Sequence, residues 1–91
     1  MARYCKRKAF VEAARWQGGK VDQLLEAFPL KARATLAAAI TQVSEDNGIV
    51  RLRSREGLTH ALAGDWIAWV EDGDYIAVYP EEVFEDLYTA A

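Results

Sequence analysis

The sequence is poor in the residues that most often build metal and catalytic sites. It has one cysteine, Cys5, and one histidine, His60. A lone thiol cannot form a disulfide within the chain, which favours a reducing compartment. One Cys and one His cannot supply the usual ligand sets for zinc, and catalysis needs several converging groups. We therefore expect no catalytic residues, no metal and no cofactor, and we expect that the protein is not an enzyme.

Long apolar runs are also missing. No stretch approaches the roughly 20 apolar residues of a membrane-spanning helix. The basic start of the chain, residues 1–8, is followed by neither an apolar segment nor a small-residue cleavage site, so we expect no signal peptide. With 91 residues, of which 52% are apolar, the chain fits one domain spanning residues 1–91. These features predict a cytoplasmic protein with no membrane partner and no small-molecule substrate.

Basic residues are absent from the last part of the sequence. Residues 56–91 contain nine acids and no Lys or Arg, whereas residues 1–55 contain eleven Lys and Arg residues and five acids. The net charge of −3 thus divides into +6 for the first part and −9 for the second. Such parts can pair with each other in the fold, or the acidic part can face a basic partner.

The first half of the sequence predicts a strand, two helices and a hairpin. Apolar and polar residues alternate loosely over residues 8–16 and predict a strand that ends at Gly18-Gly19. Its buried face carries either Val11 and Ala13 or Phe10 and Trp16, and the sequence leaves both options open. An apolar stripe predicts a helix over residues 21–28 that Pro29 stops, and the Ala-rich residues 30–39 predict a second helix. Residues 40–44 could extend that helix or form a strand. The turn signal at 46–48, before the alternating residues 49–53, favours the strand.

The second half predicts strands and a terminal helix. Residues 58–62 suit a short strand, and residues 66–70 and 75–79 suit a hairpin around an Asp72-Gly73 turn of type I′, with Val70 opposite Tyr75. Both faces of that hairpin are apolar, so either both are covered or one is an exposed aromatic patch. Residues 80–88 suit a helix that docks on the sheet through Val83, Phe84, Leu87 and Tyr88.

These elements together predict an α+β fold. We expect a small antiparallel sheet of about five strands, with two short helices before the main hairpins and one C-terminal helix.

Acidic residues gather at the predicted hairpin tip and on the last helix. They are Glu71, Asp72, Asp74, Glu81, Glu82, Glu85 and Asp86. An acidic face of this kind can imitate a phosphate backbone and occupy a basic nucleic-acid channel on a partner, although charge runs are often only solvated surface. Trp69 and Tyr75, together with Trp66 and Tyr79, are candidate anchors for a protein partner if they are exposed.

Two basic groups support an alternative function. One lies near the N-terminus and consists of Arg3, Lys6, Arg7 and Lys8 together with Arg15 and Lys20. The other is Arg51, Arg53 and Arg55, of which Arg51 and Arg53 share one face of a predicted strand. Such groups contact phosphates, so the alternative is a nucleic-acid-binding accessory protein, although the net negative charge argues against it. A further alternative is a structural or assembly protein that oligomerises through the apolar hairpin face.

Several short motifs resemble those of small proteins of tailed bacteriophages and prophages whose function is unassigned. The opening strand is similar to their Val-x-Glu-Ala-x-x-Trp pattern, here Phe10 to Trp16. The end of the chain is similar in Gly64-Asp65-Trp66-Ile67, Asp72-Gly73, and Phe84 with Tyr88. The resemblance covers about the first 17 and the last 28 residues. It implies a phage or prophage origin, the host cytoplasm as location, and an accessory rather than virion-building role.

From the resemblance and the acidic residues we expect a non-enzymatic protein-binding module. Its partner would be a host protein or a protein–nucleic-acid complex, and inhibition of a bacterial defence system such as CRISPR–Cas is the function that we favour.

Overall fold

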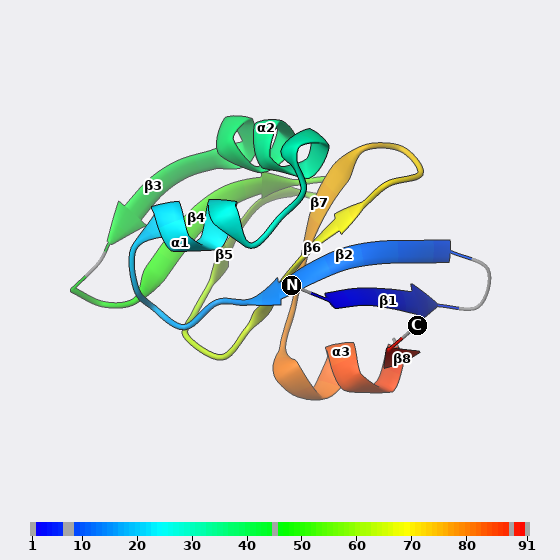
Figure 1. Cartoon of the computed structure of the whole chain (residues 1–91). Helices are drawn as coiled ribbons and strands as arrows, with labels where there is room; N and C mark the ends of the chain where they lie inside the picture. Colours follow the sequence, from blue (N-terminus) through cyan, green and yellow to red (C-terminus); the bar gives the residue numbers. More distant parts are fainter. Residues whose placement is uncertain (1, 7–8, 45, 88, 91) are drawn as a thin grey trace.

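The computed structural model shows an α+β domain whose strands lie in two antiparallel sheets (Figure 1). It describes residues 2–6, 9–44, 46–87 and 89–90, and the side chains of 11–44 and 46–87. The α+β class is confirmed. The prediction of a single sheet of about five strands is wrong, because the strands divide between a five-stranded and a three-stranded sheet.

The five-stranded sheet has the order β7-β6-β2-β1-β8 and combines both ends of the chain. Its strands are β1 (Ala2–Lys6), β2 (Ala9–Arg15), β6 (Trp66–Val70), β7 (Tyr75–Tyr79) and β8 (Thr89–Ala90). In the β6–β7 hairpin Val70 lies opposite Tyr75 and Trp66 opposite Tyr79, so the predicted register is confirmed. β7 is one edge of this sheet.

The turn of the β6–β7 hairpin differs from the prediction. The N–H of Asp74 donates to the carbonyl of Glu71 at 3.2 Å. The φ angle is positive at Gly73 (103°) and Asp74 (51°) but not at Asp72. A type I′ turn centred on Asp72-Gly73 needs positive φ at both residues, so that prediction is wrong.

The three-stranded sheet has the order β3-β4-β5, and two helices precede it in the chain. The strands are β3 (Ile40–Ser44), β4 (Ile49–Ser54) and β5 (Gly57–Ala61), and the helices are α1 (Val21–Glu26) and α2 (Leu30–Ala39). Residues 40–44 therefore form the strand that the sequence favoured, in keeping with the β-branched Ile40, Thr41 and Val43. In Figure 1 both helices lie over this sheet.

An apolar cluster covers each face of the five-stranded sheet. On one face Trp16, Ile67, Trp69 and Ile76 pack with side chains of α1, α2 and the three-stranded sheet, namely Leu24, Phe28, Ala32, Leu36, Val50, Leu52 and Ala61. On the other face Val11, Ala13, Ala68 and Val70 pack with Phe84 of α3 (Glu81–Leu87). Of the two options for the buried face of β2, Val11 with Ala13 is confirmed, and Trp16 just after the strand is buried on the opposite side, whereas the side chain of Phe10 lies outside the described residues. The alternative of an exposed aromatic hairpin face is wrong, because both faces are covered.

Three loops join the two sheets at the end of β2. The N–H of Trp16 donates to Asp65 O at 2.8 Å, and its indole Nε1–H donates to Gly48 O at 2.8 Å. Gly18 has a φ of +80°, and a Cβ there would lie 3.3 Å from the Cβ of Ala63 and 3.4 Å from the Cα of Gly48. Only glycine meets both the left-handed backbone and this close approach.

Candidate functional site

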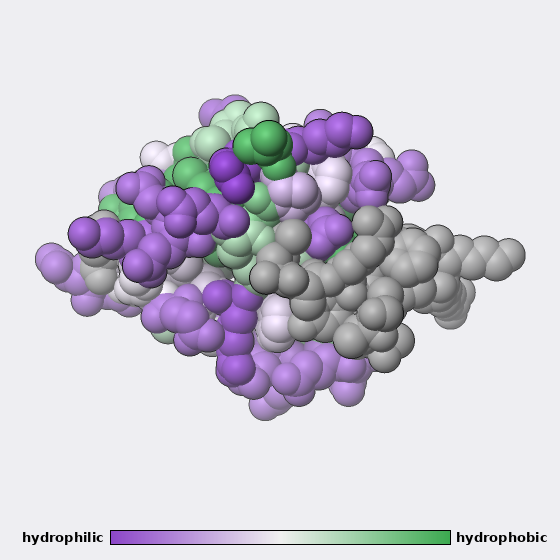
Figure 2. All heavy atoms as spheres, in the orientation of Figure 1, coloured by the Kyte–Doolittle hydropathy of each residue, from purple (hydrophilic) through white to green (hydrophobic). Residues whose placement is uncertain are grey.

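Three of the four acidic side chains of α3, Glu82, Glu85 and Asp86, are exposed on the side of the helix away from the sheet. Phe84 is 1% exposed, and its ring stacks on Trp66 with centroids 4.4 Å apart, which fixes how the helix is rotated. At about 100° per residue, Glu85, Glu82 and Asp86 lie about 100° to 160° around the helix axis from Phe84, whereas Glu81 lies only about 60° from it. In Figure 2 hydrophilic residues cover the bottom of the molecule, where α3 lies in Figure 1.

Two apolar side chains border these acids. Val83 is 42% exposed and Leu87 is 36% exposed, and residues four apart are neighbours on a helix surface. The prediction that both belong to a buried stripe is wrong, because the helix docks through Phe84, with Trp66 and Tyr79 packed around its ring. The predicted fourth member of that stripe, Tyr88, lies outside the described residues. We call the exposed residues Glu82, Val83, Glu85, Asp86 and Leu87 the α3 surface.

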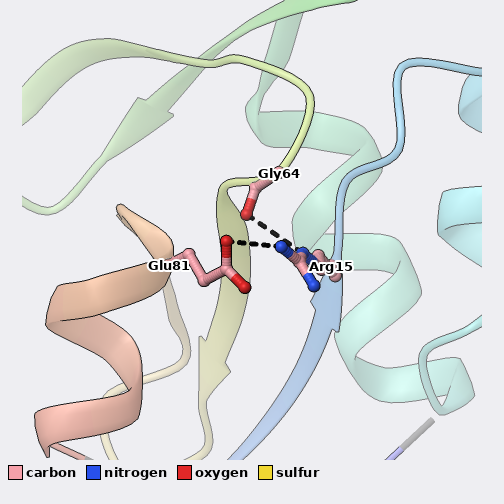
Figure 3. Close-up of polar contacts among 3 residues, drawn as sticks. All are labelled: Arg15, Gly64 and Glu81. Carbon is pink, nitrogen blue, oxygen red and sulfur yellow. Dashed lines mark hydrogen bonds and ion pairs between the residues drawn. The ribbon is translucent and has the colours of Figure 1, made fainter.

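Glu81 makes an internal contact rather than extending that surface (Figure 3). Its Oε2 lies 2.5 Å from Nη2 of Arg15, whose Nε–H also donates to the carbonyl of Gly64 at 3.3 Å. The pair fastens the start of α3 to the end of β2 and offsets the charge of Glu81.

Asp74 also makes internal contacts. Its Oδ1 accepts hydrogen bonds from Thr35 Oγ1 of α2 at 2.6 Å and from Trp69 Nε1 at 2.6 Å. The bond from Thr35, and then the bond from Trp69, lowers the pKa of this carboxyl group below its usual value. Asp74 therefore ties the tip of the β6–β7 hairpin to α2.

The predicted acidic residues form two groups rather than one face. The loop with Glu71, Asp72 and Asp74 precedes β7, and α3 follows it, so the two groups lie at opposite ends of that strand. Figure 1 shows the hairpin tip near α2 and α3 at the bottom of the molecule.

The aromatic candidates are only partly accessible. Trp69 is 5% exposed and belongs to the core, so the structure does not support its predicted role as an anchor. Tyr75 is half-buried, and the guanidinium carbon of Arg55 lies over its ring, 4.9 Å from the ring centroid. Trp66 and Tyr79 are half-buried beside Phe84.

The arginines of β4 lie on the outer face of the three-stranded sheet. Arg51 and Arg53 are exposed, and they alternate with Val50 and Leu52, which are fully buried. Among the described residues, neither guanidinium group has an acidic partner. Arg55 lies in the turn after β4. Arg7 and Lys8 and the side chains of Arg3 and Lys6 lie outside what the structure describes.

A groove with a volume of about 590 Å³ runs along β7. One wall is β7 itself, and the other consists of Ser54, Arg55, Glu56, Leu58 and Thr59 from the β4–β5 hairpin. Leu58 is 76% exposed. This groove was not predicted from the sequence, although an uncharged strand without Pro or Gly, placed between acidic residues, was a signal for it.

Within the described ranges, no group of three or more His, Cys, Asp or Glu side chains could hold a metal ion. His60 is exposed on β5, opposite Arg51. No helix in the part of the chain that the structure covers is long and apolar enough to cross a membrane.

Comparisons of the chain with models of protein families, with curated proteins and with solved structures find no match. The resemblance to small phage proteins stays a prediction, and the function has to be argued from the surfaces described above.

Proposed function

We propose that this chain is a non-enzymatic protein-binding module that modulates a host protein, and that the α3 surface occupies a basic nucleic-acid channel of that protein. The single observation that carries the proposal is the composition of this surface. Glu82, Glu85 and Asp86 are exposed and have no basic partner among the described residues, and Val83 and Leu87 lie beside them. The resemblance to phage accessory proteins favours a bacterial defence system of the CRISPR–Cas kind as the target.

The density of charge on α3 suits a mimic of nucleic acid. At about 1.5 Å per residue, the three acids from Glu82 to Asp86 span about 6 Å of helix axis. A nucleic-acid strand carries one charge per roughly 3.4 Å. The exposed Val83 and Leu87 add apolar contact area, and the centres of protein interfaces are apolar. This mixture favours a protein over a small cation as the partner.

Apart from the ion pair of Arg15 with Glu81, the described side chains show no ion pair between the basic and the acidic half of the chain. If the halves only neutralised each other, the acids of α3 would face the arginines of β4. Instead both sets are exposed and unpaired with each other within the described residues. The separation leaves the acids of α3 available to a basic partner.

Charge reversal on α3 tests the proposal. The variant Glu82→Lys/Glu85→Lys/Asp86→Lys is compared with Asp22→Lys/Glu26→Lys/Asp46→Lys, which changes the net charge equally at exposed acids elsewhere. In affinity capture from a bacterial lysate followed by mass spectrometry, we expect the wild type and the control to retain the same nucleic-acid-binding protein. The α3 variant should retain at least tenfold less, and added double-stranded DNA or RNA should release the captured protein.

Equal capture by both triple variants would show that the acids of α3 are not the interface. Capture that added nucleic acid leaves unchanged would reject the mimicry and keep only the protein binding.

A second candidate function, direct nucleic-acid binding, is favoured by the guanidinium groups of Arg51 and Arg53, which are exposed and have no acidic partner among the described side chains. It predicts a gel shift with duplex DNA or RNA at about 50 mM salt that weakens as salt rises, because bound counterions are released. The variant Arg51→Glu/Arg53→Glu should abolish the shift. Absence of any wild-type shift at that salt concentration rejects this function.

The third function considered, an oligomer built through the apolar hairpin face, loses its basis, because both faces of that hairpin are covered.

A further inference from the structure

The outer edge of β7 carries main-chain groups that point into the groove. Bonded and non-bonded pairs alternate along an antiparallel ladder. The N–H of Trp16 bonds to Asp65, so by alternation the pairs Ala14–Ile67 and Glu12–Trp69 are the bonded ones between β2 and β6. The residues between them, Ala68 and Val70, then direct their main-chain groups toward β7.

The same alternation assigns the residues of β7. Ala77 and Tyr75 lie opposite Ala68 and Val70 and so use their N–H and C=O groups on β6. The main-chain N–H and C=O groups of Ile76 and Val78 therefore point away from β6, toward the groove that these two residues line. Neither residue bonds through its main chain to the opposite wall in the described part of the molecule.

The β4–β5 hairpin lies across the groove from β7, but the strand itself lacks the features by which edge strands usually avoid pairing with other chains. Such features are a central Lys or Pro, a bulge or a very short strand. β7 has the sequence Tyr-Ile-Ala-Val-Tyr and pairs with β6 without a register shift. Aromatic and β-branched residues favour extended pairing, so this edge is suited to accept another strand.

The charges around the strand indicate what kind of segment would bind. Asp72 and Asp74 precede β7, and Glu82 follows it. The opposite wall contains one basic residue, Arg55, and one acidic residue, Glu56, and so has no net charge. Two copies of the chain paired antiparallel through β7 would place the acidic loop of one beside the acidic start of α3 of the other. Two copies paired in parallel would place their two acidic loops side by side, and likewise the acidic starts of their two α3 helices. Both arrangements are repulsive, whereas a segment with basic residues at both ends is attracted.

We propose that β7 binds an extended segment of a partner protein as an additional strand of the five-stranded sheet. The segment has about five β-forming residues, matching the length of β7, with basic residues on both sides. Main-chain bonds to Ile76 and Val78 hold it, and Leu58 on the opposite wall contacts its apolar side chains. This inference rests on the proposed function, because the segment belongs to the same partner protein that binds the α3 surface. A synthetic peptide tests it without the partner being known.

The probe is a fluorescein-labelled peptide of nine residues, with two lysines at each end and alternating threonine and valine between them. We expect saturable binding to the wild-type protein by fluorescence anisotropy. Methylation of all the central peptide nitrogens removes their N–H groups and should weaken binding at least tenfold. Replacement of the four lysines by glutamates should weaken it similarly.

A pair of protein variants tests the edge directly. Val78→Pro removes an N–H that faces the groove and spares the bonds to β6, whereas Val78→Ala keeps that N–H. We expect the proline variant to lose at least tenfold in affinity and the alanine variant to lose less than threefold, with circular dichroism confirming that both fold. If Val78→Pro does not fold, the methylated peptide decides the question on the wild-type protein.

Equal binding of the methylated and unmethylated peptides would overturn the proposal. So would light scattering that shows a dimer which the peptide dissociates, because the occupant would then be a second copy. Failure of peptide binding while capture still depends on the acids of α3 rejects this inference alone. Peptide binding by a protein that captures no partner through α3 rejects the proposed function alone.

Discussion

The acidic residues of the β6–β7 loop have different roles although they look alike in the sequence. Asp72 is exposed to solvent. Asp74 has a φ of 51° and accepts hydrogen bonds from Thr35 and Trp69. The different roles of Asp72 and Asp74 could not be predicted from the sequence, because Thr35, the hydrogen-bond partner of Asp74, lies 39 residues away in the chain.

The lowered pKa of Asp74 makes part of the stability dependent on pH. A carboxyl group whose pKa is lower in the folded state stabilises the fold above its unfolded pKa, and this contribution is lost as the pH falls through the folded pKa. For Asp74 the loss therefore occurs below the reference value of 3.8. We expect Asp74→Asn to lower the melting temperature near pH 7 by a few degrees and to have a much smaller effect near pH 2.

Asparagine tolerates the left-handed backbone at this position, so the comparison isolates the charge. Asp72→Asn is the matched control in the same loop and should leave the melting temperature unchanged at both pH values. A deficit of Asp74→Asn that stays constant from pH 7 to pH 2 would contradict the role of its ionised form.

At the scale of elements, α3 depends on a single buried ring. Phe84 is 1% exposed and stacks on Trp66, whereas its neighbour Val83 is 42% exposed. Removing a buried Phe side chain costs about 3–5 kcal/mol, so we expect Phe84→Ala to reduce the free energy of unfolding by that amount in urea titrations. Val83→Ala should change it by less than about 0.5 kcal/mol. Similar losses for both would show that the helix docks differently.

Most elements could be predicted from the sequence, because their signals are local. The first helix forms as predicted but ends at Glu26, two residues earlier than the predicted end before Pro29. The Ala-rich residues 30–39 are helical, and the hairpin register follows from the alternation on each side of the loop. The turn type could not be predicted, because Asp-Gly also suits turns in which the aspartate has negative φ. For α3, the stripe pattern could not show that so short a helix would bury only Phe84.

At the scale of the whole molecule, the division into two sheets was not predictable from local patterns. It depends on contacts between distant loops, such as the bond from the indole of Trp16 to Gly48 and the close approach of Gly18 to Ala63. For the same reason the sequence identified β7 as a strand but not as an edge. The burial of Trp69 could not be predicted either, because both faces of the hairpin carry apolar residues and the sequence does not show which face is more deeply covered.

The short link between β7 and α3 has a consequence for affinity. Only Pro80 separates the end of β7 at Tyr79 from the start of α3 at Glu81, and the buried ring of Phe84 holds the helix in place. A ligand that has bound one of the two surfaces meets the other at an effective concentration set by this rigid spacing, which for short links is in the millimolar range. Two individually weak contacts on one partner would therefore act as one strong attachment, and cutting the ligand between them would lose most of its avidity.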